Sequence, residues 1–255
     1  MKVLSLFTKI LHYLPSEFSH FVALEGLNLL NSIGMLKFFK GNSYKHNFDD
    51  RDLRNHSHMV GIAAGLDKNA DYIDSLGALG VGFVEVGTVT PKPQKGNPKP
   101  RIFRNLKERS LLNRLGFNNK GVDHLVNNLK KKKSNVLIGT SIGKNFDTPN
   151  QRASEDYIYC LEKTYEYSDY IAVNISSPNT QDLRNLSKEE FLSSLLKDLK
   201  NNQNKLSIIH GYKPIFIKIS PDESLENLNA ICKSIKEISL DGVICSNTSI
   251  EHNDK

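Results

Sequence analysis

The sequence predicts an α/β fold with parallel strands, because short apolar runs alternate with amphipathic helical patterns along most of its 255 residues. The spacing of strand, helix and strand is typical of right-handed βαβ units. Polar residues follow at least five of the expected strands, and a closed barrel would bring those strand ends to one centre. About six units are visible, so we expect an incomplete TIM (β/α)8-type barrel. An open Rossmann-like sheet, which concentrates its site at one switch point, is the alternative.

Residues 1–40 are predicted to form an N-terminal arm of two helices. Apolar residues recur at helical spacing both before and after Pro15. No apolar stretch approaches the ~20 residues that span a bilayer, and lysines interrupt the first pattern too often for a signal-peptide core. The two helices either lie on a membrane surface or pack on the domain. Residues 41–57 are polar and charged, so we expect a linker there and the barrel domain at 58–255.

The spacing of apolar residues predicts the strands and helices of the barrel domain in order along the chain. Short apolar, β-branched runs predict strands at 59–64, 81–86, 136–140, 170–175, 214–219 and 241–246. Apolar residues three and four apart predict helices at 72–79, 122–129, 152–166, 187–201 and 225–237. A long segment to about residue 112 is rich in proline, lysine and glycine. Loops of more than about 15 residues in compact domains are usually lids or binding loops.

The composition narrows the possible functions. The formal net charge of +6 would suit a nucleic acid, an anionic membrane or an anionic substrate. The three cysteines have neither metal-ligand nor CxxC spacing and give no disulfide framework, so a reducing compartment fits best. The expected strand ends carry no cluster of histidine, cysteine or paired carboxylates. This argues against a bound metal, zinc hydrolysis and two-carboxylate glycosidase chemistry.

Lysines, amides and hydroxyls recur at the expected strand ends, and they suit a planar, polar, anionic ligand. Lys218 lies in an apolar strand, where an unpaired ammonium is costly unless it faces a negative partner. That partner is either a ligand or a carboxylate on a neighbouring strand, such as Glu85. Lys68 is either a ligand contact or a surface lysine that opens a helix. Residues 113–119 form either a binding loop or a turn into the next helix. The strand-end candidates are Lys68, Thr88, Asn174, Ser177, Lys218, Ser246, Asn247 and Thr248.

Six segments together resemble class 2 dihydroorotate dehydrogenase, the quinone-dependent FMN enzyme of pyrimidine synthesis. They occur in the order of the family, and six motifs in register are far more specific than any one of them. The segments are GIAAGLDK at 61–68, EVGTVTP at 85–91, NRLGFN at 113–118, NISSPNT at 174–180, IKI at 217–219 and SNT at 246–248.

The resemblance implies a catalytic residue and a substrate site. Ser177 would be the general base that removes a proton from dihydroorotate while a hydride passes to the flavin. Class 1 enzymes carry cysteine there, so the serine argues for class 2. A serine hydroxyl is a poor base, so it needs a closed site and an outlet for the proton, for which Thr180 is a candidate. The substrate would contact Lys68, Asn113, Arg114, Leu115, Gly116, Phe117, Asn174, Asn179, Asn247 and Thr248.

The resemblance also implies a cofactor site and a quinone site. Lys218 would stabilise negative charge on the flavin ring as hydride arrives. Arg104 would stand at the mouth of the quinone pocket, with the two N-terminal helices forming an apolar tunnel. FMN would contact Ala64, Gly65, Leu66, Asp67, Lys68, Thr88, Ser141, Asn174, Lys218 and Ser246.

The chain departs from the family pattern at several positions. Ser141 stands where the family usually has an FMN-binding asparagine. The shorter side chain keeps a hydrogen-bonding group, so we expect that contact to be lost or bridged by water. His58-Met59 replaces the usual Asn-Pro, and Ser246 replaces a common threonine conservatively. The glycine-rich loops of strands 7 and 8, which hold the FMN phosphate, are missing. We therefore expect weak FMN binding and exposed sheet edges.

The expected partners are dihydroorotate or orotate and a membrane quinone, with no nucleic acid. The arm predicts peripheral association with the cytoplasmic side of a bacterial inner membrane, because no Arg-rich presequence precedes Phe7. The alternatives are another FMN-barrel reductase, such as one that reduces uridine in tRNA, and an inactive truncated remnant. The tRNA-directed enzymes use a cysteine acid, and only Cys245 lies near an expected strand end.

Overall fold

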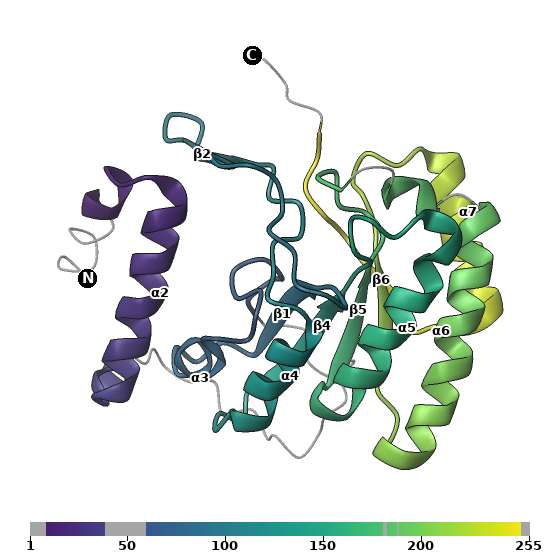
Figure 1. Ribbon diagram of the computed structural model, residues 1–255, viewed down its shortest axis with the longest axis horizontal. Coiled ribbons are helices and arrows are strands. Elements are labelled where there is room, and N and C mark those ends of the chain that lie inside the picture. The colour runs from purple at the N-terminus through teal and green to yellow at the C-terminus, as the bar shows by residue number, and fades with distance from the viewer. Residues whose placement is uncertain (1–8, 39–59, 181–182, 188, 251–255) are drawn as a thin grey trace.

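A parallel sheet forms the centre of the computed structural model, which describes residues 9–38, 60–180, 183–187 and 189–250. Its strands lie in the order β1-β4-β5-β6-β7, and every neighbouring pair is parallel (Figure 1). Among the described residues the sheet does not close on itself, so the fold is an incomplete barrel of the predicted α/β class. The strands are β1 (Phe83–Val89), β4 (Leu137–Ile142), β5 (Tyr170–Asn174), β6 (Ile215–Lys218) and β7 (Gly242–Ile244).

The first predicted strand is reduced to a single parallel bridge, between Ile62 and Val84. The Ile62 amide donates to the Phe83 carbonyl at 2.9 Å, and the Glu85 amide donates to the Ile62 carbonyl at 2.8 Å. The segment therefore runs beside β1 in the predicted position but is too short to count as a strand. Met59, where the predicted strand begins, lies outside the described residues.

Helices α4, α5, α6 and α7 cover one face of the sheet (Figure 1). They span Val122–Lys131, Ala153–Thr164, Glu189–His210 and Leu225–Ile238, close to the predicted ranges except at one end. α6 continues to His210 and not only to residue 201, because neither proline nor glycine interrupts the sequence before Gly211. The short helix α3 (Ile73–Gly77) also lies within its predicted range.

An antiparallel hairpin replaces the end of the predicted long loop. It consists of β2 (Ile102–Asn105) and β3 (Ser110–Asn113), and it projects from the sheet toward the N-terminal arm (Figure 1). The prediction of an irregular loop was wrong for these residues. Each strand has only four residues, and most of them are exposed, so the apolar alternation that identifies a strand is missing.

The N-terminal arm contains helical residues 9–12 and helix α2 (Ser16–Ser32), which is followed by the 3-10 turn η1 (Met35–Phe38). One side of α2 packs on the barrel: Leu24 is buried, and the Tyr72 hydroxyl donates to Glu25 Oε1 at 2.7 Å. The predicted linker at 41–57 lies outside the described residues.

Several apolar side chains of α2 nevertheless remain exposed. Phe18, Phe21 and Leu29 are 51%, 53% and 62% exposed. Of the helices that the structure describes, none is both long enough and apolar enough to cross a membrane.

The two faces of the sheet differ in chemistry because side chains alternate along each strand. On β1, Val84 and Val86 belong to the helix-covered core, whereas Glu85 faces the inner side with Tyr170 and Lys218. These inner side chains border a hollow of about 400 Å³, which we call the inner cavity. It is lined by Ala63, Phe83, Glu85, Tyr170, Phe216, Lys218, Val243, Ile244, Cys245 and Ser246.

Candidate active site

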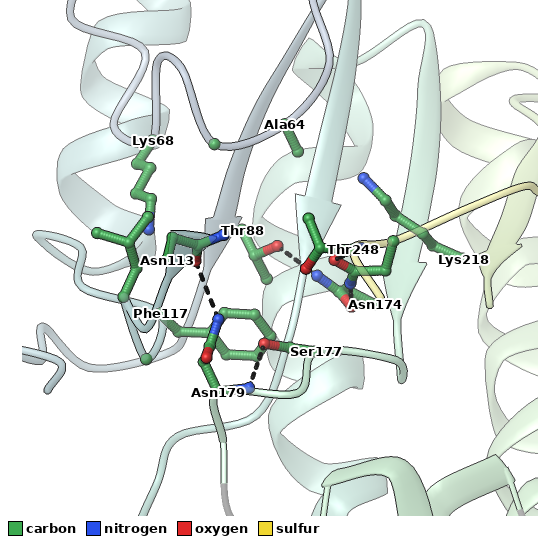
Figure 2. A pocket seen from close by; sticks show the side chains of 14 residues that line it. Ala64, Lys68, Thr88, Asn113, Phe117, Asn174, Ser177, Asn179, Lys218 and Thr248 are labelled. Atoms are coloured by element: carbon green, nitrogen blue, oxygen red, sulfur yellow. Dashed lines mark hydrogen bonds between the residues drawn. The ribbon is translucent and has the colours of Figure 1, made fainter. Parts of the chain in front are cut away.

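A second hollow, the strand-end cavity, lies where the carboxyl ends of the parallel strands meet (Figure 2). Its volume is about 130 Å³, and every residue that lines it was named from the sequence. The structure therefore brings together side chains from segments as far apart as Ala64 and Thr248. The lining residues are Ala64, Gly65, Lys68, Thr88, Asn113, Leu115, Gly116, Phe117, Asn174, Ser177, Asn179, Lys218, Asn247 and Thr248.

A network of amides and hydroxyls joins the ends of several strands in this cavity. The Asn174 amide group, at the end of β5, donates to Thr88 Oγ1 on β1 at 2.8 Å. The Asn247 amide, after β7, donates to Asn174 Oδ1 at 3.1 Å. The Thr88 hydroxyl in turn lies 2.9 Å from the Ser141 hydroxyl on β4. These bonds fix the amides before any ligand arrives, which reduces the ordering cost of binding.

Ser177 is buried on the loop that follows β5, with 6% of its surface exposed. Its hydroxyl oxygen accepts from the Asn179 backbone amide at 3.3 Å. The Asn179 side-chain amide donates to Asn113 Oδ1 at 3.0 Å, so the loop is tied to the end of β3 (Figure 2). The Thr180 hydroxyl is buried and has no hydrogen-bond partner among the described residues. Ser177 thus has a fixed position in a largely water-excluded site.

The two lysines of the cavity come from different sides of it (Figure 2). The Lys68 ammonium donates to Asn118 Oδ1 at 2.8 Å. Burial and, secondarily, the nearby Arg101 lower the pKa of Lys68 to about 8, with Glu17 partly offsetting both. A group with this pKa is mostly charged at neutral pH and can bind an anion.

Lys218 Nζ lies 3.7 Å from Glu85 Oε1, and Glu85 Oε2 accepts from the Tyr170 hydroxyl at 2.9 Å. Burial and the adjacent Glu85 raise the pKa of Tyr170, so the hydroxyl remains a donor. The carboxylate alternative for Lys218 is therefore present in the structure. The ammonium has a carboxylate partner below it and still lines the strand-end cavity.

The comparisons with known proteins agree with this geometry. The family model described as dihydroorotate dehydrogenase matches residues 45–255. A protein named dihydroorotate dehydrogenase (quinone) from Neisseria meningitidis serogroup C is 45% identical over 244 residues. One of the same name from Vibrio parahaemolyticus is 54% identical over 193 residues. The chain belongs to the dihydroorotate dehydrogenase family.

Solved structures of the family agree in fold as well as in sequence. The crystal structure of DHODH in complex with ferulenol from Eimeria tenella has a TM-score of 0.71 and 37% identity, over 76% of this chain and 57% of that one. The alignments cover 95% of this chain and 72% of the Neisseria relative, and 75% of this chain and 57% of the Vibrio relative. The alternative of a tRNA-directed reductase finds no support in these comparisons, and neither does that of an inactive remnant. Cys245, the candidate acid of a tRNA-directed reductase, lines the inner cavity and not the strand-end cavity.

Membership of the dihydroorotate dehydrogenase family implies a flavin cofactor, and the strand-end cavity fits the polar edge of a flavin ring. Lys218, Asn174 and Thr88 offer charged and neutral donors along one side. Nothing lies within 4 Å of the position that a Cβ would take on Gly65, so the backbone there is open to a flat ring. The cavity alone is smaller than the roughly 300–1,000 Å³ of typical ligand pockets. Lys218 also lines the inner cavity, which offers further space beside it.

Several residues expected in the flavin site lie next to the strand-end cavity and not on its surface. Ser141 is buried and does not line the cavity; its hydroxyl lies 2.9 Å from that of Thr88, which does. Leu66 and Asp67 face the arm, and Ser246 lines the inner cavity. The Asp67 carboxylate accepts from the Asp71 and Tyr72 amides at 2.9 and 2.8 Å.

Arg114, which was expected in the substrate site, turns away from the strand-end cavity. Its guanidinium donates twice to the Pro100 carbonyl, at 3.0 and 2.9 Å, and stacks 5.7 Å from the centre of the Phe103 ring. It therefore stabilises the base of the hairpin.

A third hollow of about 490 Å³, the arm cavity, lies between α2 and the segment 65–72. It shares Gly65, Lys68 and Leu115 with the strand-end cavity, so a single layer of residues separates the two. Its lining differs from the apolar tunnel that was expected. It comprises Glu17, His20, Phe21, Glu25, Asn28, Gly65, Leu66, Asp67, Lys68, Asn69, Asp71, Tyr72, Ile102, Leu115, Asn118 and Lys120.

Arg104 does not line the arm cavity, although it was expected at the mouth of a quinone pocket. Its guanidinium donates to Ser16 Oγ at 3.0 Å, to the Leu11 carbonyl at 3.0 Å and to the Leu14 carbonyl. These groups lie where the first helical segment ends and α2 begins. Arg101 makes the analogous contact from the same hairpin, donating to Glu17 Oε1 at 2.9 Å. The two arginines therefore fasten the arm to the hairpin.

Asn118 and Arg184 contact the site but were not named from the sequence as site residues. Asn118 holds the Lys68 ammonium. Arg184 donates to the Ser176 and Thr248 carbonyls, both at 3.3 Å, and its Nη1 lies 2.9 Å from Asp222 Oδ2. One guanidinium thus joins the loops after β5, β6 and β7. Asn118 lies 50 residues from Lys68 and Arg184 lies 64 residues from Thr248, so no local pattern could have indicated these contacts.

Proposed function

We propose that the chain oxidises dihydroorotate to orotate, with FMN as its flavin and a quinone as the electron acceptor, in pyrimidine synthesis. The observation that carries the proposal is the convergence of Lys68, Ser177 and Lys218 on one cavity. The relatives of 45% and 54% identity, both named dihydroorotate dehydrogenase (quinone), support it.

The lining of the strand-end cavity suits a substrate with one carboxylate and a ring of amide groups. The Lys68 ammonium provides a charge-assisted donor for the carboxylate. Carboxamides offer both a donor and an acceptor, which match the N–H and C=O groups of the ring. The candidates are Asn113, Asn174, Asn179 and Asn247, with Thr248 beside them.

Ser177 is the proposed general base. Its oxygen is held by the Asn179 amide and would take the proton from the substrate carbon next to the one that loses hydride. A bound flavin supplies the hydride acceptor. The site needs a closed environment because serine is a weak base. The Thr180 hydroxyl, buried and without a hydrogen-bond partner among the described residues, is the proposed next acceptor of the proton.

Lys218, Thr88 and Asn174 are the proposed contacts to the polar edge of the flavin, with Ala64 and Gly65 against its face. The positive charge of Lys218 would favour the reduced, more negative ring. Ser141 would act on the flavin only through Thr88. Leu66, Asp67 and Ser246, which lie outside the cavity surface, would support its walls.

The arm cavity is the proposed site of the quinone headgroup. An acceptor there would be separated from the strand-end cavity only by Gly65, Lys68 and Leu115. The exposed Phe18, Phe21 and Leu29 on α2 would contact the acyl region of a bilayer, as in a helix that lies in the membrane interface. We infer peripheral attachment to the cytoplasmic side of a bacterial inner membrane.

The test is anaerobic mixing of the FMN-loaded chain with dihydroorotate, followed by absorbance of the flavin. The wild-type chain should lose its yellow colour, whereas Ser177→Ala should be slower by about 10²–10⁴-fold with the flavin still bound. Ser207→Ala, on the surface of α6, serves as the matched control. Near-normal reduction in Ser177→Ala would refute the role of Ser177, and no reduction of the wild-type chain would refute the proposed function.

A further inference from the structure

Lys68 lies in the wall between the strand-end cavity and the arm cavity, and its ammonium has an unusual partner. Asn118 accepts its hydrogen bond at 2.8 Å from the side of the arm cavity. Among the described residues no carboxylate comes within 4.0 Å of Lys68 Nζ. The ammonium is therefore anchored by a neutral oxygen.

The charged groups around Lys68 are already paired with other groups. Glu17 is bonded to Arg101 at 2.9 Å. Asp71 accepts from Lys120 at 3.0 Å and faces His124 at 2.8 Å, and the Asp67 carboxylate is bonded to two backbone amides. Glu25 accepts from the Tyr72 hydroxyl. His20, also near Lys68, has a pKa lowered first by burial and then by this lysine. No described neighbour therefore neutralises Lys68 directly.

The position of Asn118 is itself rigid. The side chain of the next residue, Asn119, is buried and is bonded to Thr90 Oγ1 at 2.8 Å and to the Gly121 amide at 2.8 Å. A Cβ on Gly96 would lie 2.9 Å from Asn118 Cβ, so only glycine at 96 lets Asn118 approach this closely. The acceptor that Lys68 uses is thus held in place by contacts unrelated to the cavity.

We propose that Asn118 is a positioning residue for substrate binding, which aims the Lys68 ammonium at the strand-end cavity without neutralising it. The inference rests on the proposed function, because the anion to be bound is the carboxylate of dihydroorotate or orotate. A carboxylate at position 118 would form an ion pair with Lys68 and compete with the substrate. A side chain without an acceptor would leave the ammonium unanchored.

The experiment compares the wild-type chain with Asn118→Asp and Asn118→Ala. Asn127→Asp, on the exposed face of α4, is the control for the added charge. The pKa of the Lys68 amine is measured from the pH dependence of its acetylation by acetic anhydride, followed by mass spectrometry. Orotate affinity of the FMN-loaded chain is measured by calorimetry at pH 7.

In the wild-type chain the Lys68 amine should titrate near pH 8. Asn118→Asp should raise that pKa by on the order of 1–3 units and weaken orotate about tenfold or more. Asn118→Ala should weaken orotate several-fold without raising the pKa. Asn127→Asp should change neither quantity.

Two results would overturn the inference alone. One is wild-type affinity for orotate in both Asn118 variants, and the other is an unchanged Lys68 pKa in Asn118→Asp. Absence of orotate binding by the wild-type chain would overturn the proposed function and this inference together. The acetylation profile needs no ligand, so it reports the contact between Asn118 and Lys68 even if orotate does not bind. A failed contact can thus be distinguished from a failed function.

Discussion

The strand-end cavity and the arm cavity share a wall but are held together in different ways. The first includes residues at or just after the ends of paired parallel strands, such as Thr88, Asn174 and Lys218, whose backbone the ladder fixes. The second depends on a helix that reaches the barrel through side chains, chiefly Arg101 and Arg104. The comparison teaches that much of the chemistry at the strand ends is built into the sheet, whereas the arm cavity depends on side-chain contacts of the arm with the barrel and the hairpin.

The two cavities also differ in charge. The strand-end cavity has two lysines and many neutral amides, with its nearest carboxylate, Glu85, below Lys218. The arm cavity includes four carboxylates, those of Glu17, Glu25, Asp67 and Asp71. We therefore expect an anionic substrate to bind in the strand-end cavity. Lys68, in the wall between the two cavities, would contact it from that side.

The largest effect in this comparison is expected from Arg184, which joins three strand-end loops. Arg184→Ala should weaken orotate by roughly 10–100-fold, because loss of these bonds is worth about 1–3 kcal/mol. Added guanidinium should restore part of the affinity. Arg152→Ala is the control, since Arg152 pairs with Glu155 on the surface. Unchanged binding in Arg184→Ala would mean that the sheet alone positions these loops.

Substitution of Arg104 should affect the arm cavity and leave the strand-end cavity unchanged. Arg104→Ala removes the contacts to Ser16 and to the Leu11 and Leu14 carbonyls, so the arm should loosen. We expect the KM for a soluble quinone to rise about tenfold, which corresponds to about 1.4 kcal/mol. Anaerobic reduction by dihydroorotate should stay at the wild-type rate. Loss of that first half-reaction would contradict the separation of the two regions.

The smallest effect is expected from Asp67, on the segment between the cavities. Burial raises its pKa to about 6, against the opposing effect of three backbone hydrogen bonds. The folded chain therefore holds this proton more tightly than the unfolded chain does. The free energy of unfolding should fall as the pH rises from about 4 to 6, by at most about 1.4 kcal/mol per pH unit.

Asp67→Asn should flatten this slope in urea titrations. The exposed Asp147→Asn should leave it as in the wild-type chain. An equally steep slope in Asp67→Asn would assign the pH dependence to another group.

The sequence was most informative about side chains that lie at or just after the end of a parallel strand. The apolar run before Asn174 identifies β5, so Asn174 and Ser177 had to lie at its carboxyl end, and the same argument places Lys218 on β6. Parallel pairing then brings these ends together without further information. The strand-end cavity follows almost entirely from this argument and from the family motifs.

The arm and the hairpin were less predictable. β2 and β3 are short and mostly exposed, so their pattern resembles a loop. Arg104 was expected at the quinone pocket from the family resemblance, but its guanidinium donates to the Leu11 carbonyl at the end of the first helical segment. Asn118 acts on a residue 50 positions away, which only the folded chain reveals.

The central claim is that the parallel strand ends form one substrate site, and a crystal structure of the FMN-loaded chain with orotate tests it most directly. The account predicts orotate in the strand-end cavity, with its carboxylate within hydrogen-bond distance of Lys68 Nζ and its ring beside Ser177. Orotate bound in the arm cavity beside His20 and Phe21, or bound without contact to Lys68 and Ser177, would contradict it.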